Sequence, residues 1–157
     1  MRLDLQSLRT ALRRSFAGFL DRVEPGLREE HRLGRAAFLD EEALADWPAA
    51  DRRRLGLIAD LAAIPAGARG TRRITVLVQI EPRVRRACAL ERRLLRYSLW
   101  LLASRRRPVR LIVIDLEGGP LGVQARAIVE TWRGRERLHL PYKLLRLAGR
   151  RLEDWLV

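Results

Sequence analysis

The 157-residue sequence contains a single cysteine, Cys88, so neither an intramolecular disulfide nor a cysteine-pair zinc site can form. Its two histidines, His31 and His139, are far apart and have no acidic or cysteine companions at ligand spacing, which favours ordinary packing or surface roles. No apolar run is long enough to span a membrane, and the N-terminus has no signal-peptide core. These absences predict a soluble protein of a reducing, bacterial-type cytoplasm, with no membrane as partner.

Well-known catalytic motifs are missing too. The sequence contains no Gly-rich phosphate loop (GxxxxGK[ST] or GxGxxG), no GxSxG elbow and no HExxH zinc motif. Aromatic residues make up only 6% of the chain, and they do not alternate with basic residues, which argues against a stacking platform for single-stranded nucleic acid. Function must therefore be sought in the charge and in isolated polar residues.

The charge is strongly one-sided and almost entirely due to arginine. Lys143 is the only lysine among 32 basic residues, and the net charge of +13 attracts polyanions. Residues 1–50 have a net charge of −1, whereas residues 51–157 have +14. The excess is greatest in 83–110, with ten arginines and one acid, Glu91. A polyanion site is therefore predicted in the middle or C-terminal part.

The hydrophobic pattern predicts one α/β domain covering residues 1–157, with a mixed central β-sheet flanked by helices. Helices are expected over 5–23, 83–104 and 150–157. Strands are expected at 37–39, at 109–116 and, more weakly, at 125–132 and 138–145. Residues 55–64 and 74–80 are expected to form a buried hairpin. The helix over 83–104 would then connect two strands of the same sheet.

Three polar residues stand out in the predicted hairpin. Asp60 interrupts its first strand, and Gln79 and Glu81 lie two apart at the end of the second, so they project to one face. Asp60 and Glu81 could hold a hard cation such as Mg²⁺. Alternatively, Asp60 pairs with an arginine, and Glu81, which precedes Pro82, caps the following helix.

The predicted helix 83–104 has a basic side and an apolar side. Arg85, Arg86, Arg92, Arg93 and Arg96 fall within an arc of roughly 120°. The opposite arc holds Val84, Cys88, Leu94, Leu95, Leu99, Leu101 and Leu102. Glu91 lies among these apolar residues, where it would point into a site or pair with an internal basic group. The basic arc is either a phosphate-binding surface or simply the solvated side of a helix that covers a sheet.

The order of these features resembles the Rpn family of recombination-promoting nucleases, a transposase-like family within the PD-(D/E)XK superfamily. Residues 16–20 (FAGFL) with Pro25 are similar to its opening helix, and 37–40 (AFLD) to its first strand. Residues 59–61 (ADL) resemble the strand that carries its metal-binding aspartate. Residues 78–81 (VQIE) fall where members show Glu-x-Gln. Residues 93–97 (RLLRY) and 106–109 (RRPV) are similar to its helix and the entry to its next strand.

This resemblance implies the PD-(D/E)XK fold and metal-dependent DNA cleavage. It implies Asp60 and the residue at position 79 as metal ligands. Tyr97, and Glu91 from its place on the helix, are accessory candidates. Here Gln79 stands where the family has glutamate, and Glu81 where it has glutamine. The carboxylate has therefore moved two residues, about 6–7 Å along the strand.

Three hypotheses follow. In the first, the protein is a Mg²⁺- or Mn²⁺-dependent DNA endonuclease in which Asp60 and Glu81 bind the metal and Gln79 orients the attacking water. The arginines of the helix would then hold phosphates. In the second, the protein is a catalytically inactive, nuclease-derived module that binds DNA without sequence preference. In the third, residues 83–104 bind a membrane surface or a protein partner.

Overall fold

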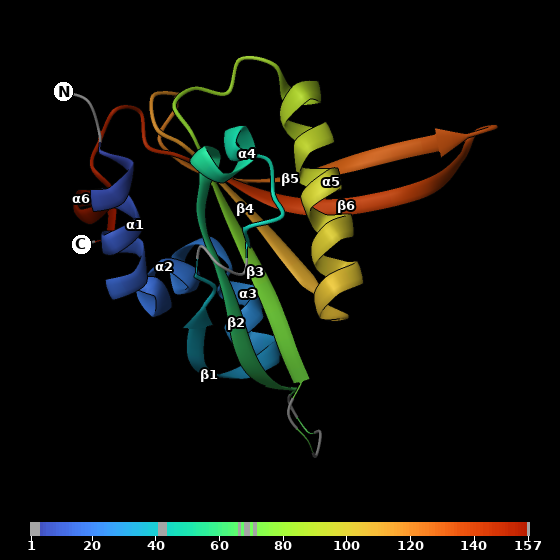
Figure 1. Cartoon of the computed structure of the whole chain (residues 1–157), viewed down its shortest axis with the longest axis horizontal. Coiled ribbons are helices and arrows are strands. Elements are labelled where there is room, and N and C mark those ends of the chain that lie inside the picture. The colour runs from blue at the N-terminus through green and yellow to red at the C-terminus, as the bar shows by residue number, and fades with distance from the viewer. Residues whose placement is uncertain (1–3, 41–43, 66, 68–69, 71, 157) are drawn as a thin grey trace.

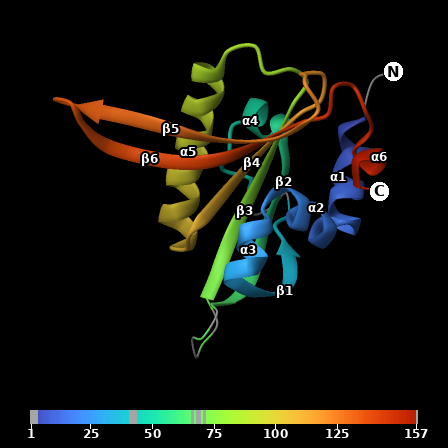
Figure 2. The same cartoon turned by 180° about the vertical axis from the view of Figure 1, so that it is seen from behind.

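The computed structural model describes residues 4–40, 44–65, 67, 70 and 72–156, and its six strands form one mixed sheet in the order β1-β2-β3-β4-β6-β5 (Figure 1). Helices cover both faces: α5 lies in front of the sheet in Figure 1, and α2 and α3 come to the front in Figure 2. The predicted α/β class, with a mixed central sheet flanked by helices, is confirmed.

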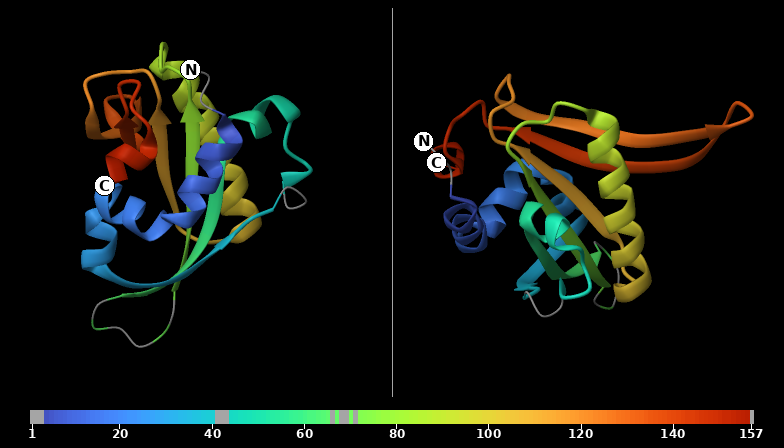
Figure 3. Two further views of the ribbon diagram at one scale, coloured as in Figure 1. Left: turned by 90° about the vertical axis from the view of Figure 1, so that its left-hand side faces the viewer. Right: turned by 45° about the horizontal axis from the view of Figure 1, so that its top comes forward.

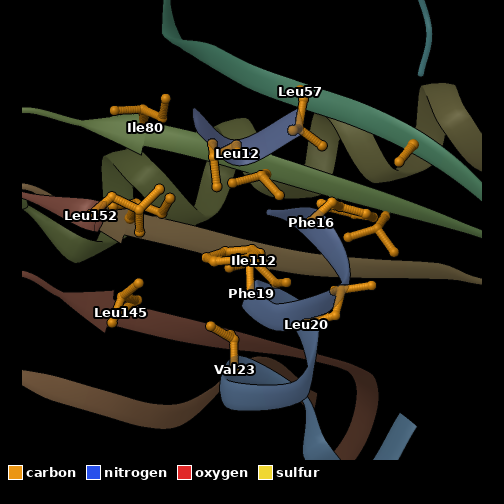
Figure 4. Packing of buried hydrophobic residues seen from close by; sticks show 14 of the residues in the cluster. Leu12, Phe16, Phe19, Leu20, Val23, Leu57, Ile80, Ile112, Leu145 and Leu152 are labelled. Carbon is orange, nitrogen blue, oxygen red and sulfur yellow. The ribbon is translucent and has the colours of Figure 1, made fainter. Parts of the chain in front are cut away.

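The first face is covered by the helices at the two chain ends. These are α1 (Leu5–Arg14), α2 (Phe16–Val23), α3 (Pro25–Glu30) and α6 (Leu152–Leu156). The single helix predicted over 5–23 is divided at Ser15, which is the C-cap of α1 and the N-cap of α2. Apolar side chains recurring every three or four residues, such as Leu12, Phe16 and Phe19, pack between these helices and the sheet (Figure 4).

Strands β1 to β4 are joined by two antiparallel pairings and one helical crossover. Strands β1 (His31–Phe38), β2 (Leu55–Pro65) and β3 (Arg72–Glu81) run antiparallel in succession, which confirms the predicted buried hairpin. Helix α5 (Ala87–Arg105) then carries the chain to β4 (Val109–Asp115), which is parallel to β3. The short helix α4 (Ala49–Arg54) precedes β2.

Helix α5 covers the second face of the sheet, but along a different stripe from the one predicted. It begins at Ala87, so Arg85 and Arg86 precede it. Its buried residues are Leu90, Leu94, Tyr97, Ser98 and Leu101. Cys88, Leu99 and Leu102, expected on the apolar side, are exposed. The prediction is confirmed for Leu94 and Leu101 and wrong for these three residues. Apolar residues occur on both sides of this helix, and only contact with the sheet selects one side.

A long hairpin completes the sheet. Strands β5 (Gly122–Trp132) and β6 (Arg135–Arg146) pair antiparallel, and β6 also pairs with β4 in parallel. The two weaker predicted strands are therefore confirmed, and both are longer than expected. The hairpin extends past α5, most clearly in the right-hand view of Figure 3. Strands β1 and β5 are the two edges of the sheet.

Candidate functional site

Asp60 lies on the α5 face of the sheet, 4% exposed, beneath the C-terminal end of that helix. The Thr75 hydroxyl donates to Oδ1 at 2.8 Å, and Oδ2 contacts the guanidinium groups of Arg105 and Arg107, the latter at 2.9 Å. Burial opposes the charged form, but these three partners outweigh it and hold the pKa of Asp60 below its usual value. Of the two alternatives for Asp60, pairing with arginine is the one the structure contains.

Gln79 and Glu81 lie together on the same face of β3, as their spacing predicted. The Gln79 amide donates to the Glu81 carboxylate at 2.5 Å, and the Arg93 guanidinium donates to the same oxygen at 2.6 Å. Gln79 is fully buried and Glu81 is 6% exposed. Glu81 therefore anchors the first half of α5 to the end of β3. Arg93, expected on the solvent side of the helix, points inward, because this carboxylate draws it toward the sheet.

The two predicted metal ligands are not brought together. The β2–β3 register places Asp60 opposite Thr75, six residues before Glu81, and Gln79 opposite Leu55. At about 3.3 Å per residue, Asp60 and Glu81 are about 20 Å apart along the sheet. Ligands of one Mg²⁺ lie about 2.1 Å from the ion, so these carboxylates do not fit a shared ion. The described residues also contain no cluster of three or more His, Cys, Asp or Glu side chains suited to a metal.

A second buried ion pair, missed by the sequence analysis, adjoins Glu81. Asp115 ends β4 directly beside Glu81 in the parallel register, and Arg146 of β6 is its next neighbour. Asp115 is 1% exposed, accepts from the Gly118 amide at 2.8 Å and lies 3.8 Å from Arg146 Nε. The available signal was that both parallel strands end in an acid, in the stretches VQIE and IVID.

Two tyrosines fasten α5 to its surroundings through carboxylates. The Tyr97 hydroxyl donates to Asp51 at 2.5 Å, and Arg96 donates to both oxygens of the same carboxylate at 3.1 Å. The Tyr142 hydroxyl donates to Glu91 at 3.0 Å, so Glu91 makes a hydrogen bond inside the protein. Burial and then the carboxylate partner raise the pKa of Tyr97 to about 12, and the same causes raise the pKa of Tyr142.

These shifts predict a delayed tyrosine titration. The chain has only two tyrosines, so we expect the tyrosinate absorbance of the native protein to rise above pH 10, with Tyr97 ionising near pH 12. The unfolded protein should titrate at about pH 10. Because the native state holds the proton more tightly, the associated stability is complete below pH 10 and is lost as the pH rises toward 12. Coincident curves for native and denaturant-unfolded protein would contradict this.

Two groups of exposed arginines have no acidic partner within the described residues. The first group, which we call the helix-entry arginines, precedes or begins α5 and comprises Arg83, Arg85, Arg86 and Arg92. The second group, the hairpin arginines, lies at the tip of the β5–β6 hairpin and comprises Arg133, Arg135 and Arg137. Arg96, which was also predicted to bind phosphate, forms a salt bridge with Asp51, although its side chain is 62% exposed.

The hairpin arginines are the functional candidates that sequence analysis did not single out. The sequence feature that could have indicated them is the arginine-rich stretch WRGRER (132–137) between two predicted strands. Trp132 beside them is 63% exposed, and the Arg133 guanidinium lies 5.9 Å from its ring centre.

A separate cleft of about 570 Å³ opens between α1, α4 and the start of β2, lined by Arg9, Arg13, Arg52 and Asp40 among others. None of the predicted site residues lines that cleft.

Comparison with protein-family models, with curated proteins and with solved structures gave no match. The resemblance to recombination-promoting nucleases therefore stays a prediction that rests on the residues quoted for it. None of the described helices is long and apolar enough to cross a membrane.

Proposed function

We propose that this protein binds DNA non-specifically through its two groups of exposed arginines, and that it does so without cleaving the DNA. The observation that carries the proposal is where the acids are placed. Asp51, Asp60, Glu81 and Asp115 are all buried, and each lies within 4 Å of an arginine. These four acids face five arginines, so nearly all of the net charge of +13 comes from other residues.

The kind of positive charge favours a phosphate backbone as the partner. Duplex DNA presents one negative charge per about 1.7 Å of its length, and a guanidinium group donates two parallel hydrogen bonds to one phosphate. The seven arginines of the two groups are exposed and have no acidic partner among the described residues, so no ion pair seen there must be broken when they contact phosphates.

The geometry around Asp60 argues against DNA cleavage. A Mg²⁺-dependent endonuclease of the predicted kind needs Asp60 as a metal ligand beside the Gln79–Glu81 pair. Both oxygens of Asp60 are already engaged by Thr75, Arg105 and Arg107, and the register separates Asp60 from Glu81 by six residues of β3. We therefore propose the inactive, DNA-binding alternative for this chain.

The test is a salt titration of binding to a short labelled duplex, combined with a plasmid-nicking assay. If the seven arginines of the two groups each neutralise one phosphate, a plot of log K against log salt will have a slope of about −6. Supercoiled plasmid should be retarded but left intact in Mg²⁺ or Mn²⁺. A flat salt response would contradict the binding proposal. Metal-dependent nicking that is lost in Asp60→Ala would restore the endonuclease hypothesis.

A further inference from the structure

Strand β5 is an edge of the sheet with an unusual concentration of exposed apolar side chains. Seven large apolar residues are exposed among the described residues, and four of them belong to β5 or directly precede it: Leu121, Val123, Val129 and Trp132. One side of β5 pairs with β6, and nothing in the described chain pairs with the other. An eleven-residue edge of this kind presents free backbone donors and acceptors to another strand.

The sequence of β5 is complementary to itself when read in the opposite direction. Its only charged residues are Arg126 and Glu130, placed symmetrically about Ile128. In an antiparallel pair centred on Ile128, Arg126 of each strand faces Glu130 of the other, and Ala127 faces Val129. The arrangement therefore forms two opposite-charge pairs and an apolar centre. Direct cross-strand pairs of these kinds stabilise an antiparallel ladder.

The other exposed candidates lack this property. Edge strand β1 has eight residues, is interrupted by a bulge between Leu33 and Ala36, and carries exposed Arg32 and Arg35, which repel a second copy of themselves. The outward side of α5 exposes Leu99 and Leu102, but arginine lies at both ends of that stripe, at Arg92 and Arg106. Antiparallel pairing of α5 with itself would bring these arginines together.

We propose that β5 pairs with β5 of a second copy of this chain, antiparallel and centred on Ile128, to form a symmetric dimer with one continuous sheet. Such an interface uses the same strand twice and is closed, so it buries both edges and leaves no free β5 behind. This inference goes beyond DNA binding, and it is tested without DNA, so either proposal can fail alone.

The experiment is a set of charge changes at positions 126 and 130, measured by analytical ultracentrifugation. The wild type should be dimeric at about 100 µM, where a micromolar dimer is populated. Glu130→Arg creates two Arg–Arg pairs and Arg126→Glu creates two Glu–Glu pairs, so each variant should dimerise roughly ten-fold or more weakly. An equimolar mixture of the two variants should form a heterodimer, because every pair is then opposite in charge.

Controls separate this interface from general damage. Arg126 contacts Gln124 at 3.2 Å, so each variant is first checked for an unchanged circular dichroism spectrum. Glu117→Arg, an exposed position outside β5 with the same change of charge, should dimerise like the wild type. A monomeric wild type at about 100 µM would overturn the proposal. So would variants that dimerise as well as the wild type, or a mixture no more dimeric than its components.

Discussion

Replacing the four helix-entry arginines by glutamine will weaken duplex binding by roughly a thousand-fold at about 0.1 M salt. Each of Arg83, Arg85, Arg86 and Arg92 is exposed and has no acidic partner among the described residues, so its full charge is available to a phosphate. The slope of log K against log salt should fall from about −6 to about −3. The measurement is fluorescence anisotropy of a labelled duplex at several salt concentrations.

The same salt titration can be made on a variant in which only the three hairpin arginines are replaced. Glutamine at the three hairpin arginines should reduce the slope to about −4, because four contacts remain. The seven-fold variant should lose almost all salt dependence. None of these arginines forms a salt bridge with a residue that the structure describes, so thermal unfolding of the variants should match that of the wild type.

A matched control distinguishes two local sites from diffuse attraction. Arg14, Arg32, Arg35 and Arg150 are also exposed and lie on other parts of the chain. Changing all four to glutamine removes the same charge as the helix-entry variant. We expect the slope of this control to stay close to the wild-type value. An equal loss in both variants would mean that net charge alone drives binding, and the two groups would not be a site.

Asp60→Asn is the second substitution with a large expected effect, and the effect is on stability. The change leaves Arg105 and Arg107 beside a neutral group, in a place where Asp60 is 4% exposed. Removing one partner of a buried ion pair costs about 3 kcal/mol. For a chain of this size the midpoint of thermal unfolding should fall by about 10 °C. The slope of DNA binding should not change.

The pH dependence provides a check on the same group. The pKa of Asp60 in the folded state lies below its usual value, because Thr75, Arg105 and Arg107 outweigh the effect of burial. Its contribution to stability is therefore complete above about pH 4 and is lost as the pH falls through the lower folded pKa. The stability difference between wild type and Asp60→Asn should shrink in that acidic range.

Asp46→Asn is the control, because Asp46 is exposed and the charge change is identical. It should leave the unfolding midpoint nearly unchanged. An Asp60→Asn variant that is as stable as the wild type, yet loses metal-dependent nicking, would contradict the structural role and support a catalytic one.

The class of the fold was predictable because its signals are local. Apolar residues repeat every three or four positions in the first helices, and the β-branched run in 74–80 is typical of a buried strand. The same holds for Gln79 and Glu81, since residues two apart on a strand always share a face. Their contact in the structure follows from spacing alone.

The candidate metal site could not be predicted in the same way, because it depends on register. Asp60 and Glu81 lie on neighbouring strands, as the sequence predicted, and the structure places them on the same face of the sheet. Whether they meet is decided by where the turn between the strands falls, and a shift of a few residues moves one group along the sheet by many ångströms. The structure pairs Asp60 with Thr75, and Arg105 at the end of α5 and Arg107 just after it complete its environment.

The sequence by itself determined the α/β class, most of the strands and helices, and a large excess of arginine. Only the tertiary structure decided which arginines form ion pairs with buried carboxylates. Arg93, Arg105 and Arg107 turn inward to buried carboxylates, whereas the hairpin arginines remain outside. The physical reason is that a buried charge must find an opposite charge across the sheet, and such partners come from distant parts of the chain that no local pattern connects.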